Sequence, residues 1–351
     1  MFDYNNPVVQ KDLEDICHVS IPWFSLAGKR ILVTGANGMI ATYLIYMLMY
    51  FVQKYKIDIK VIALSRNKQK AEILFENFLN TPHFVLLIQD ICSPIDYAGK
   101  VDYIFHFAGN ASPYFIQNDP VGIMKSNLLG MINVLEVARE KEIEKVIFAS
   151  TREVYGKNEI DNLLSEDSFG YIDCLDDRSC YPESKRAAES LCKSYYLQYG
   201  VNFNTVRIAH TYGPGMKLSN DGRIMADLIK CVVDNQNIVL KSTGESLRAF
   251  CYVSDTVVGL FHILLFGKRA EPYNLANEIE EISIRSLAEM LIEMYPKKKL
   301  NLEYKLSENQ SSAYCNYQRV RLDTRKIENI GWLPTVSLRE GLKRTVKSFE
   351  G

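Results

Sequence analysis

Short apolar segments alternate with longer amphipathic ones from residue 30 to residue 208. The short segments predict β-strands buried on both faces of a sheet, because such strands read as continuous apolar runs. The longer segments carry apolar residues at helical spacing and predict helices. The predicted strands span residues 30–34, 60–64, 84–88, 101–107, 145–149 and 203–208, and the predicted helices span 39–54, 126–141 and 183–199.

This alternation predicts an α/β fold with a doubly wound, mostly parallel Rossmann sheet and right-handed crossovers. We assign residues 29–212 to this dinucleotide-binding domain. Short strands, glycine and proline turns and isolated helices then predict a smaller α/β substrate-binding lobe over residues 213–351, with some segments returning to the first domain. Residues 1–28 form an N-terminal lead-in, in which Trp23 and Phe24 are expected to pack on the body of the protein.

Composition narrows the possible partners. The net charge of −1 over 351 residues gives no basic field for nucleic acid or an anionic membrane surface. The eight cysteines show no CxxC pair and no metal-ligand spacing, so we expect reduced, mostly buried thiols and no metal site. No apolar run reaches the ~18–20 residues of a membrane span, and the acidic N-terminus does not resemble a signal peptide. These features predict a cytoplasmic protein without membrane or nucleic-acid partners.

A glycine-rich turn at residues 34–41 (TGANGMIA) follows the first predicted strand and opens the first predicted helix. Gly35 permits the tight turn, Gly38 lets the backbone approach a pyrophosphate, and Ala41 allows close helix–strand packing. The helix N-terminus supplies free N–H groups for the phosphates. This strand–turn–helix context predicts a dinucleotide site rather than a plain glycine turn. The remaining residues assigned to this turn are Asn37, Met39 and Ile40.

The residue that ends the second strand meets the adenosine ribose, where an acid favours NAD and a base favours the 2′-phosphate of NADP. The chain has Ser65 and Arg66 there. Arg66 has three interpretations: it binds a 2′-phosphate, stacks on adenine, or is a solvated loop residue. NAD is our first assignment, and NADP stays open. The other predicted cofactor contacts are Asp90, Ile91, Phe107, Ala108, Gly109, Asn127 and Ile208.

Tyr181 and Lys185 are four residues apart where a predicted helix begins, which puts both side chains on one helical face. A neighbouring ammonium lowers the tyrosine pKa from its usual value near ~10, so the phenol becomes a usable base. The lysine can also hold the nicotinamide ribose. Tyr50 and Lys54 have the same spacing and are interpreted as the exposed end of the first helix.

A hydroxyl-bearing loop at residues 148–156 follows the fifth strand, at the edge where doubly wound sheets bind ligands. Thr151 is placed to hydrogen-bond the substrate oxygen that Tyr181 deprotonates, and Glu153 is a candidate base at carbon. The alternatives are a loop-capping hydroxyl and a solvated carboxylate. Thr151, Glu153, Tyr181 and Lys185 are therefore the predicted catalytic set.

The glycine turn and the order of the Thr–Tyr–Lys set resemble the extended short-chain dehydrogenase/reductase family of sugar-nucleotide enzymes, the NAD-dependent epimerase/dehydratases. The likeness runs from Arg30 to the C-terminus, and the stretches 106–113, 178–186, 220–223 and 243–255 are most similar to the UDP-glucuronate decarboxylase (UDP-xylose synthase) branch. The resemblance implies substrate contacts at Ser112, Arg152, His210, Arg223 and Arg248. The chain departs from the pattern in three places: Thr-Arg-Glu replaces Thr-Ser-Glu, His210 replaces asparagine, and the NAD-selecting acid is missing.

The resemblance also implies a mechanism, in which Tyr181 takes the proton of the sugar 4-hydroxyl while hydride leaves C4 for the nicotinamide. Three outcomes follow from the 4-keto sugar: loss of carbon dioxide from a uronic acid, loss of water with Glu153 as base, or 4-epimerisation. Arg152 stays charged and can pair with a carboxylate, which favours decarboxylation of a nucleotide-linked uronic acid. Clamping the carboxylate also stabilises the ground state and would slow its loss, and Arg152 has a solvent-facing alternative.

The expected substrate is a UDP-, dTDP-, GDP- or CDP-linked sugar. The resemblance also implies a homodimer formed through the helices at 126–141 and 183–199, although an apolar helix face is equally explained by the core. A different class, a non-catalytic dinucleotide-binding regulator on the same fold, stays open. The complete set of Thr151, Tyr181 and Lys185 argues against it.

Overall fold

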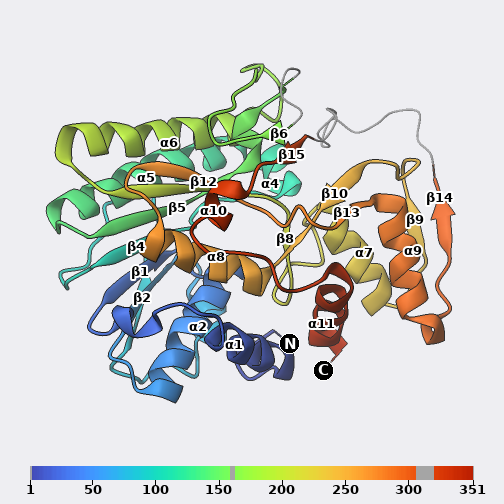
Figure 1. The fold of residues 1–351 in the computed structure, drawn as a ribbon, viewed down its shortest axis with the longest axis horizontal. Coiled ribbons are helices and arrows are strands. Elements are labelled where there is room, and N and C mark those ends of the chain that lie inside the picture. Colours follow the sequence, from blue (N-terminus) through green and yellow to red (C-terminus); the bar gives the residue numbers. More distant parts are fainter. Residues whose placement is uncertain (1, 159–162, 306–319, 351) are drawn as a thin grey trace.

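A seven-stranded parallel sheet forms the centre of the computed structural model, which describes residues 2–158, 163–305 and 320–350 (Figure 1). The strand order is β12-β7-β5-β4-β1-β2-β3, so the sheet runs outward in both directions from β1 and β4. The strands are β1 (Arg30–Thr34), β2 (Lys60–Ser65), β3 (Phe84–Ile88), β4 (Tyr103–His106), β5 (Lys145–Thr151), β7 (Phe203–Ile208) and β12 (Glu271–Leu275). All pairs are parallel, which confirms the doubly wound Rossmann prediction.

Helices cover both faces of the sheet because its strands are apolar on both sides. On one face lie α5 (Pro120–Glu140) and α6 (Cys180–Tyr199), which pack against each other and on β4, β5 and β7. On the other face lie α2 (Met39–Tyr55) and α8 (Val253–Phe266), which pack on β1, β2, β5, β7 and β12 (Figure 1). Thus α8 and β12, late in the chain, return to the Rossmann sheet.

Two helices begin earlier than the apolar periodicity indicated. α5 starts at Pro120 rather than at residue 126, because Asp119 accepts a hydrogen bond from the Gly122 N–H at 3.1 Å and proline suits the first helical position. α6 starts at Cys180 rather than at residue 183. This earlier start places Tyr181 inside the first turn of α6.

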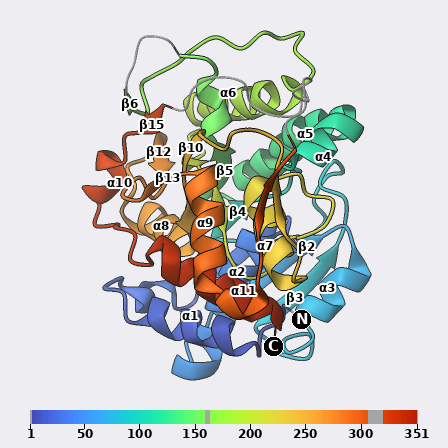
Figure 2. The same ribbon diagram turned by 90° about the vertical axis from the view of Figure 1, so that its right-hand side faces the viewer.

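A second lobe stands beside the carboxyl ends of the strands and carries α7 (Ile224–Val233), α9 (Ile284–Met294) and α11 (Leu338–Glu350) (Figures 1 and 2). Two-stranded sheets join its parts: β9 (Ile238–Leu240) with β14 (Leu302–Tyr304), and β10 (Leu247–Ala249) with β13 (Glu281–Ser283). The remaining strand pairs are β8 (Thr211–Tyr212) with β11 (Cys251–Tyr252), and β6 (Leu163–Leu164) with β15 (Arg321–Leu322). The remaining helices are α1 (Pro7–Cys17), α3 (Lys68–Leu74), α4 (Pro113–Asn118), α10 (Arg325–Glu328) and the 3-10 turns at 23–26, 152–155 and 296–298.

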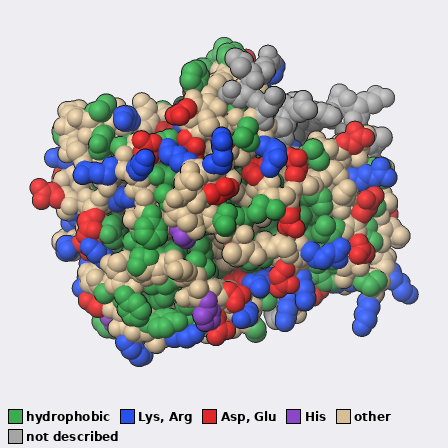
Figure 3. Space-filling model, in the orientation of Figure 1, with side chains coloured by type: hydrophobic (Ala, Val, Ile, Leu, Met, Phe, Trp, Pro, Cys, Tyr) green, Lys and Arg blue, Asp and Glu red, His purple; other side chains and the backbone are tan. Residues whose placement is uncertain are grey.

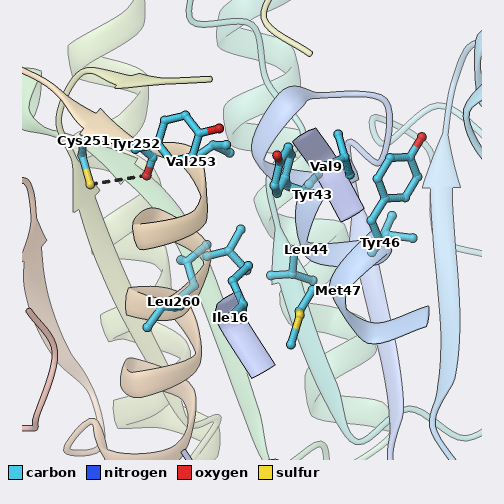
Figure 4. Close-up of a cluster of buried hydrophobic side chains, with 14 of the residues drawn as sticks. Val9, Ile16, Tyr43, Leu44, Tyr46, Met47, Cys251, Tyr252, Val253 and Leu260 are labelled. Atoms are coloured by element: carbon cyan, nitrogen blue, oxygen red, sulfur yellow. Dashed lines mark hydrogen bonds between the residues drawn. The ribbon is translucent and has the colours of Figure 1, made fainter. Parts of the chain in front are cut away.

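The N-terminal segment is folded onto the body through α1, a helix that the sequence analysis did not predict. It packs against α2, α8 and α11, and its apolar side chains enter the cluster shown in Figure 4. Trp23 is buried between Phe51 and Phe261, as expected. Phe24 is 69% exposed, so its predicted packing on the body was wrong. Because the 3-10 turn at 23–26 points Trp23 inward, its neighbour Phe24 faces outward, where its ring meets the Tyr55 ring edge to face.

The cysteines among the described residues are free thiols, but only Cys192 and Cys251 are buried, so the expectation of mostly buried thiols was wrong. The surface in Figure 3 mixes acidic and basic side chains, in keeping with the small net charge. Within the described ranges, α5 is long and apolar enough to cross a membrane by length and composition. Its packing against α6 and the sheet makes it a helix of the folded body.

Candidate active site

The glycine turn after β1 lies against the backbone that follows β4. Gly35 has a φ of +67°, and a Cβ built on it would lie 2.7 Å from the Ala108 nitrogen. A larger residue would therefore be strained and would push the two strand ends apart. The turn leads into α2, whose first residue is Met39. The backbone N–H groups at this helix start are available for a pyrophosphate.

A buried pair fixes the floor beneath this turn. The Thr34 hydroxyl is 2.7 Å from His106 Nδ1, and the Ala108 N–H donates to Thr34 Oγ1 at 3.3 Å. Burial, followed by the nearby Lys185 ammonium, lowers the pKa of His106 to about 3, so this ring is neutral at working pH. The pair joins the ends of β1 and β4 without placing a charge below the cofactor crevice. Sequence reasoning missed its role because strand register is needed to place the two residues side by side.

The structure brings together three residues that were predicted to lie near the nicotinamide: Gly109, Asn127 and Lys185. A Cβ on Gly109 would lie 2.5 Å from Asn127 Oδ1 and 3.8 Å from Lys185 Nζ. Asn127 Nδ2 donates to Ser184 Oγ at 2.8 Å, while its buried Oδ1 has no hydrogen-bond partner among the described residues. An unpartnered buried acceptor beside an ammonium is a polar contact that a bound ligand can complete.

The adenosine end is built by the loop after β2. Ser65 is buried, and the Arg66 guanidinium lies 3.7 Å from a carboxylate oxygen of Asp90. The Asn37 side-chain amide donates to the Asn67 carbonyl at 3.0 Å, which ties this loop to the glycine turn. The other predicted cofactor residues lie at the carboxyl ends of the sheet strands or at the start of α2. They are Ile40 in the first turn of α2, Ile91 after β3, Phe107 after β4 and Ile208 at the end of β7. Together these residues fit a dinucleotide.

Tyr181 is buried in the first turn of α6, with Thr151 at the end of β5 beside it. Burial raises the pKa of Tyr181 well above its ordinary value, and the Glu153 carboxylate raises that pKa further. A hydrogen bond with Thr151 and the guanidinium groups of Arg223 and Arg178 act in the opposite direction. The predicted hydroxyl pair is thus assembled, and the phenol needs added positive charge nearby to act as a base at neutral pH.

Lys185 is one helical turn beyond Tyr181 and is also buried. Its ammonium donates to the Ala149 carbonyl at 2.8 Å and lies 4.6 Å from the centre of the Phe148 ring. Burial lowers the pKa of Lys185 to about 8, against the opposing effects of Glu189 and Cys192. The ammonium is therefore the main form below this pH and the neutral amine above it. Of the pair with the same spacing, Lys54 is exposed as predicted, whereas the Tyr50 ring is partly buried and only its hydrogen bond to Lys54 is exposed.

We expect the affinity for NAD to fall as the pH rises through about 8, because the Lys185 ammonium loses its proton and its positive charge there. A binding titration between neutral and alkaline pH measures this decline. Lys185→Met should bind NAD more weakly at neutral pH and show no step near the same pH. An identical step in that variant would assign the titration to another group.

Arg178 is a charged residue of the site that the sequence analysis did not single out. It precedes α6, and its guanidinium lies 3.2 Å from one carboxylate oxygen of Glu153 and 3.4 Å from the other. Both side chains are largely shielded from solvent. Because this pair occupies the carboxylate, Glu153 is held in place beside the phenol. Arg178 lies in the turn that leads into α6, and the sequence alone carries no signal that pairs it with Glu153.

The predicted substrate residues are distributed more widely. Arg223 immediately precedes α7, donates to Asp221 at 2.7 Å, and lies close enough to Tyr181 to affect its pKa. The Arg152 guanidinium donates to the Val320 carbonyl at 3.2 Å, so part of its hydrogen-bonding capacity is used within the chain. The other predicted contacts are Ser112 at the start of α4 with a buried hydroxyl, His210 between β7 and β8 with a φ of +46°, and Arg248 on β10.

The fold and this site define a dinucleotide-dependent enzyme of the short-chain dehydrogenase/reductase type. A family model described as the NAD dependent epimerase/dehydratase family matches residues 31–276, and the chain belongs to this family. UDP-glucuronic acid decarboxylase 6 of Arabidopsis thaliana is 33% identical over 326 residues, which are 93% of this chain and 90% of that protein. UDP-glucuronic acid decarboxylase 1 of Xenopus tropicalis is 33% identical over 322 residues, 92% of this chain and 72% of that protein.

Solved structures show the same fold. A UDP-glucose 4-epimerase of Thermotoga maritima superposes with a TM-score of 0.77 at 24% identity, covering 91% of this chain and 98% of that one. A dTDP-glucose 4,6-dehydratase of Streptomyces venezuelae gives a TM-score of 0.77 at 22% identity, covering 91% and 96%. A UDP-glucuronic acid 4-epimerase of Bacillus cereus gives a TM-score of 0.74 at 22% identity, covering 92% of this chain and 96% of that one.

The chain is therefore an NAD-dependent enzyme that acts on nucleotide sugars, and the sequence prediction of this class is confirmed. A bound nicotinamide would supply hydride transfer at this site. Gly35, Gly109 and Asn127 would hold the dinucleotide, and Lys185, close to Gly109, is the residue predicted at its nicotinamide end. The roles of the individual site residues remain predictions that rest on this geometry.

Proposed function

We propose that this enzyme decarboxylates a nucleotide-linked uronic acid, with UDP-glucuronate as the first substrate to test. Thr151 hydrogen-bonds to the buried Tyr181, and the Glu153–Arg178 and Asp221–Arg223 ion pairs lie near this phenol; this arrangement carries the proposal. Hydroxyl groups at this point can bind the sugar C4 oxygen, and guanidinium groups nearby suit an acidic substrate. The relatives named as UDP-glucuronic acid decarboxylases support the same reaction.

The chemistry follows from the position of the ketone. With C4 oxidised, the C6 carboxylate is attached one carbon away from the ketone carbon, so the substrate is a β-keto acid. The C5–C6 bond then breaks and carbon dioxide leaves. The electron pair of that bond stays on C5 and is delocalised onto the C4 oxygen as an enolate. Hydrogen bonds from Thr151 and Tyr181 to that oxygen stabilise the developing negative charge. Protonation at C5 and reduction of C4 complete the pentose.

The Glu153–Arg178 ion pair favours decarboxylation over dehydration. Loss of water across C5–C6 requires a base to remove the C5 proton, and Glu153 is the candidate. Here both of its oxygens face the Arg178 guanidinium at 3.2 and 3.4 Å. Decarboxylation needs no such proton removal, because the departing carboxylate supplies the electron pair.

The direct test is to incubate the purified protein with NAD and UDP-glucuronate and to measure the mass of the sugar-nucleotide product by mass spectrometry. A mass lowered by carbon dioxide is the expected result. A mass lowered by water would indicate dehydration, and an unchanged mass with a new chromatographic position would indicate 4-epimerisation. Either of these would overturn the proposed reaction within the same family. No change with any uronate would overturn the substrate class.

We also propose a homodimer through the α5–α6 face. Less than half of the apolar span of α5 is buried within one chain, and its exposed side chains include Val121, Met124 and Leu129, with Leu197 on α6. A second copy of the same two helices would cover them in an isologous interface. Light scattering should give twice the chain mass of 40.2 kDa. A monomer at micromolar concentration would contradict the proposal.

The proposed compartment is the cytoplasm, where nicotinamide cofactors and nucleotide sugars are both present. The free thiols of the described cysteines are in keeping with a reducing compartment. A pentosyl nucleotide formed there would serve as a glycosyl donor for polysaccharide synthesis.

A further inference from the structure

The adenosine end of the crevice lacks the acid that usually selects NAD. Ser65 ends β2 and is 3% exposed, so a small neutral side chain fills the position where a carboxylate would bind the ribose hydroxyls. Arg66 follows at once, with a side chain that is 76% exposed. A phosphate on the ribose would meet a guanidinium at the end of this strand, and the nearby carboxylate is that of Asp90, 3.7 Å from Arg66.

A second cation, Lys70, lies against the glycine turn. Its ammonium donates to the Asn37 carbonyl at 2.9 Å. Desolvation by burial lowers the pKa of Lys70, and the charge of Lys217 lowers that pKa further. Lys70 is exposed at the surface, and this hydrogen bond holds its ammonium beside the turn that leads into α2.

The loop that carries both cations is held in one conformation. Asn67 accepts a hydrogen bond from the Lys70 N–H at 2.9 Å through its side chain, and from the Asn37 side-chain amide at 3.0 Å through its carbonyl. Ser65 Oγ donates to the same carbonyl at 3.4 Å. These bonds connect the end of β2, the start of α3 and the glycine turn, so Arg66 and Lys70 are presented from a connected backbone.

We propose that Arg66 and Lys70 bind the 2′-phosphate of the adenosine ribose, so that this chain accepts NADP with an affinity at least equal to that for NAD. Guanidinium groups pair with phosphate through two parallel hydrogen bonds, and an ammonium adds a second charge. The Arg66–Asp90 contact is long at 3.7 Å and exposed, so Arg66 gives it up at little cost. The proposal concerns only the cofactor and does not depend on the reaction at the sugar.

The test is a calorimetric titration of the full chain, freed of bound nucleotide, with NAD and NADP at one ionic strength. Mass spectrometry of the dinucleotide released on denaturing freshly purified protein gives a second readout. We expect NADP to bind at least as tightly as NAD. Arg66→Ala and Lys70→Gln should each weaken NADP by about tenfold, because each removes a charge-assisted bond, while NAD changes by no more than about twofold.

A matched control removes another exposed, ion-paired arginine that lies on a different helix. Arg285 on α9 is also exposed and pairs with Glu289, so Arg285→Ala lowers the net charge as Arg66→Ala does. It should leave the affinities for both dinucleotides unchanged. Thermal unfolding of each variant checks that it is folded.

Two results would overturn the proposal. One is NADP binding to the parent protein more weakly than NAD. The other is an equal loss of NAD and NADP affinity in Arg66→Ala, which would show that this side chain stacks on adenine and does not bind a phosphate.

Discussion

Tyr181→Phe should lower the turnover of UDP-glucuronate by about a thousandfold, within the range of about 10²–10⁴ that removal of a positioned acid–base group produces. The phenol is buried against Thr151 at the end of β5, where the C4 oxygen of the sugar is expected. The ring itself packs with Ile116 and Ile123, and phenylalanine preserves this contact. NAD affinity should therefore change little while turnover is lost. Product formation and cofactor binding, measured separately, give the two quantities.

The chain supplies its own control for this experiment. Tyr50 and Lys54 have the same spacing on α2, and the Lys54 ammonium donates to the Tyr50 hydroxyl at 2.9 Å on the surface. Tyr50→Phe should leave turnover within about twofold, because a surface hydroxyl contributes little. If Tyr181→Phe retains more than a tenth of the parent turnover, another group is the base and the site must be reassigned.

The difference between these two pairs shows where sequence reasoning succeeds. The four-residue spacing alone does not separate them. The position of Thr151 at the end of β5 separates them. Parallel strands bring their carboxyl ends to one edge of the sheet, and α6, which carries Tyr181, starts from that edge. The Rossmann sheet, the glycine turn and the Thr–Tyr–Lys set could all be predicted for this reason: each depends on local pattern and on a general rule of topology.

Other features depend on contacts between distant segments and could not be predicted. The pairing of Glu153 with Arg178 requires the path of the chain between β5 and α6. Lys70 reaches the Asn37 carbonyl across thirty-three positions of sequence separation. Phe24 is apolar yet exposed, because the orientation of a short 3-10 turn decides which of two adjacent aromatic side chains is buried. In each case the sequence contains the residue and the tertiary structure determines its partner.

The N-terminal helix α1 provides the second large expected effect, on stability. Asp12 is completely buried, where its carboxylate accepts hydrogen bonds from the hydroxyls of Tyr43 and Tyr252, the latter at 2.7 Å. Its other oxygen accepts from the Arg344 guanidinium at 2.7 Å. Tyr43 and Tyr252 lie on facing elements in Figure 4, so one carboxylate joins α1, α2, the end of β11 and α11.

Asp12→Ala should lower the free energy of unfolding by about 2–4 kcal/mol, because it leaves two buried hydroxyls without their shared acceptor, while Arg344 keeps Asp15 and Glu340 as partners. Urea or thermal unfolding measures this loss. Asp15 is the matched control: it also contacts Arg344, at 3.2 Å, but is partly exposed, so Asp15→Ala should cost less than about 1 kcal/mol. Equal effects of the two substitutions would mean that the buried carboxylate contributes no more than a surface ion pair.

The Asp12 carboxylate links the stability of the fold to the predicted dinucleotide crevice. Tyr43 is on α2, the helix that begins at the glycine turn, and Tyr252 immediately precedes α8 beneath the sheet. Loss of Asp12 should therefore loosen the packing between α2 and α8 that supports the dinucleotide crevice. We expect Asp12→Ala to weaken NAD binding at temperatures where the variant is still folded, while Asp15→Ala does not. Unchanged NAD affinity in folded Asp12→Ala would confine the role of this carboxylate to global stability.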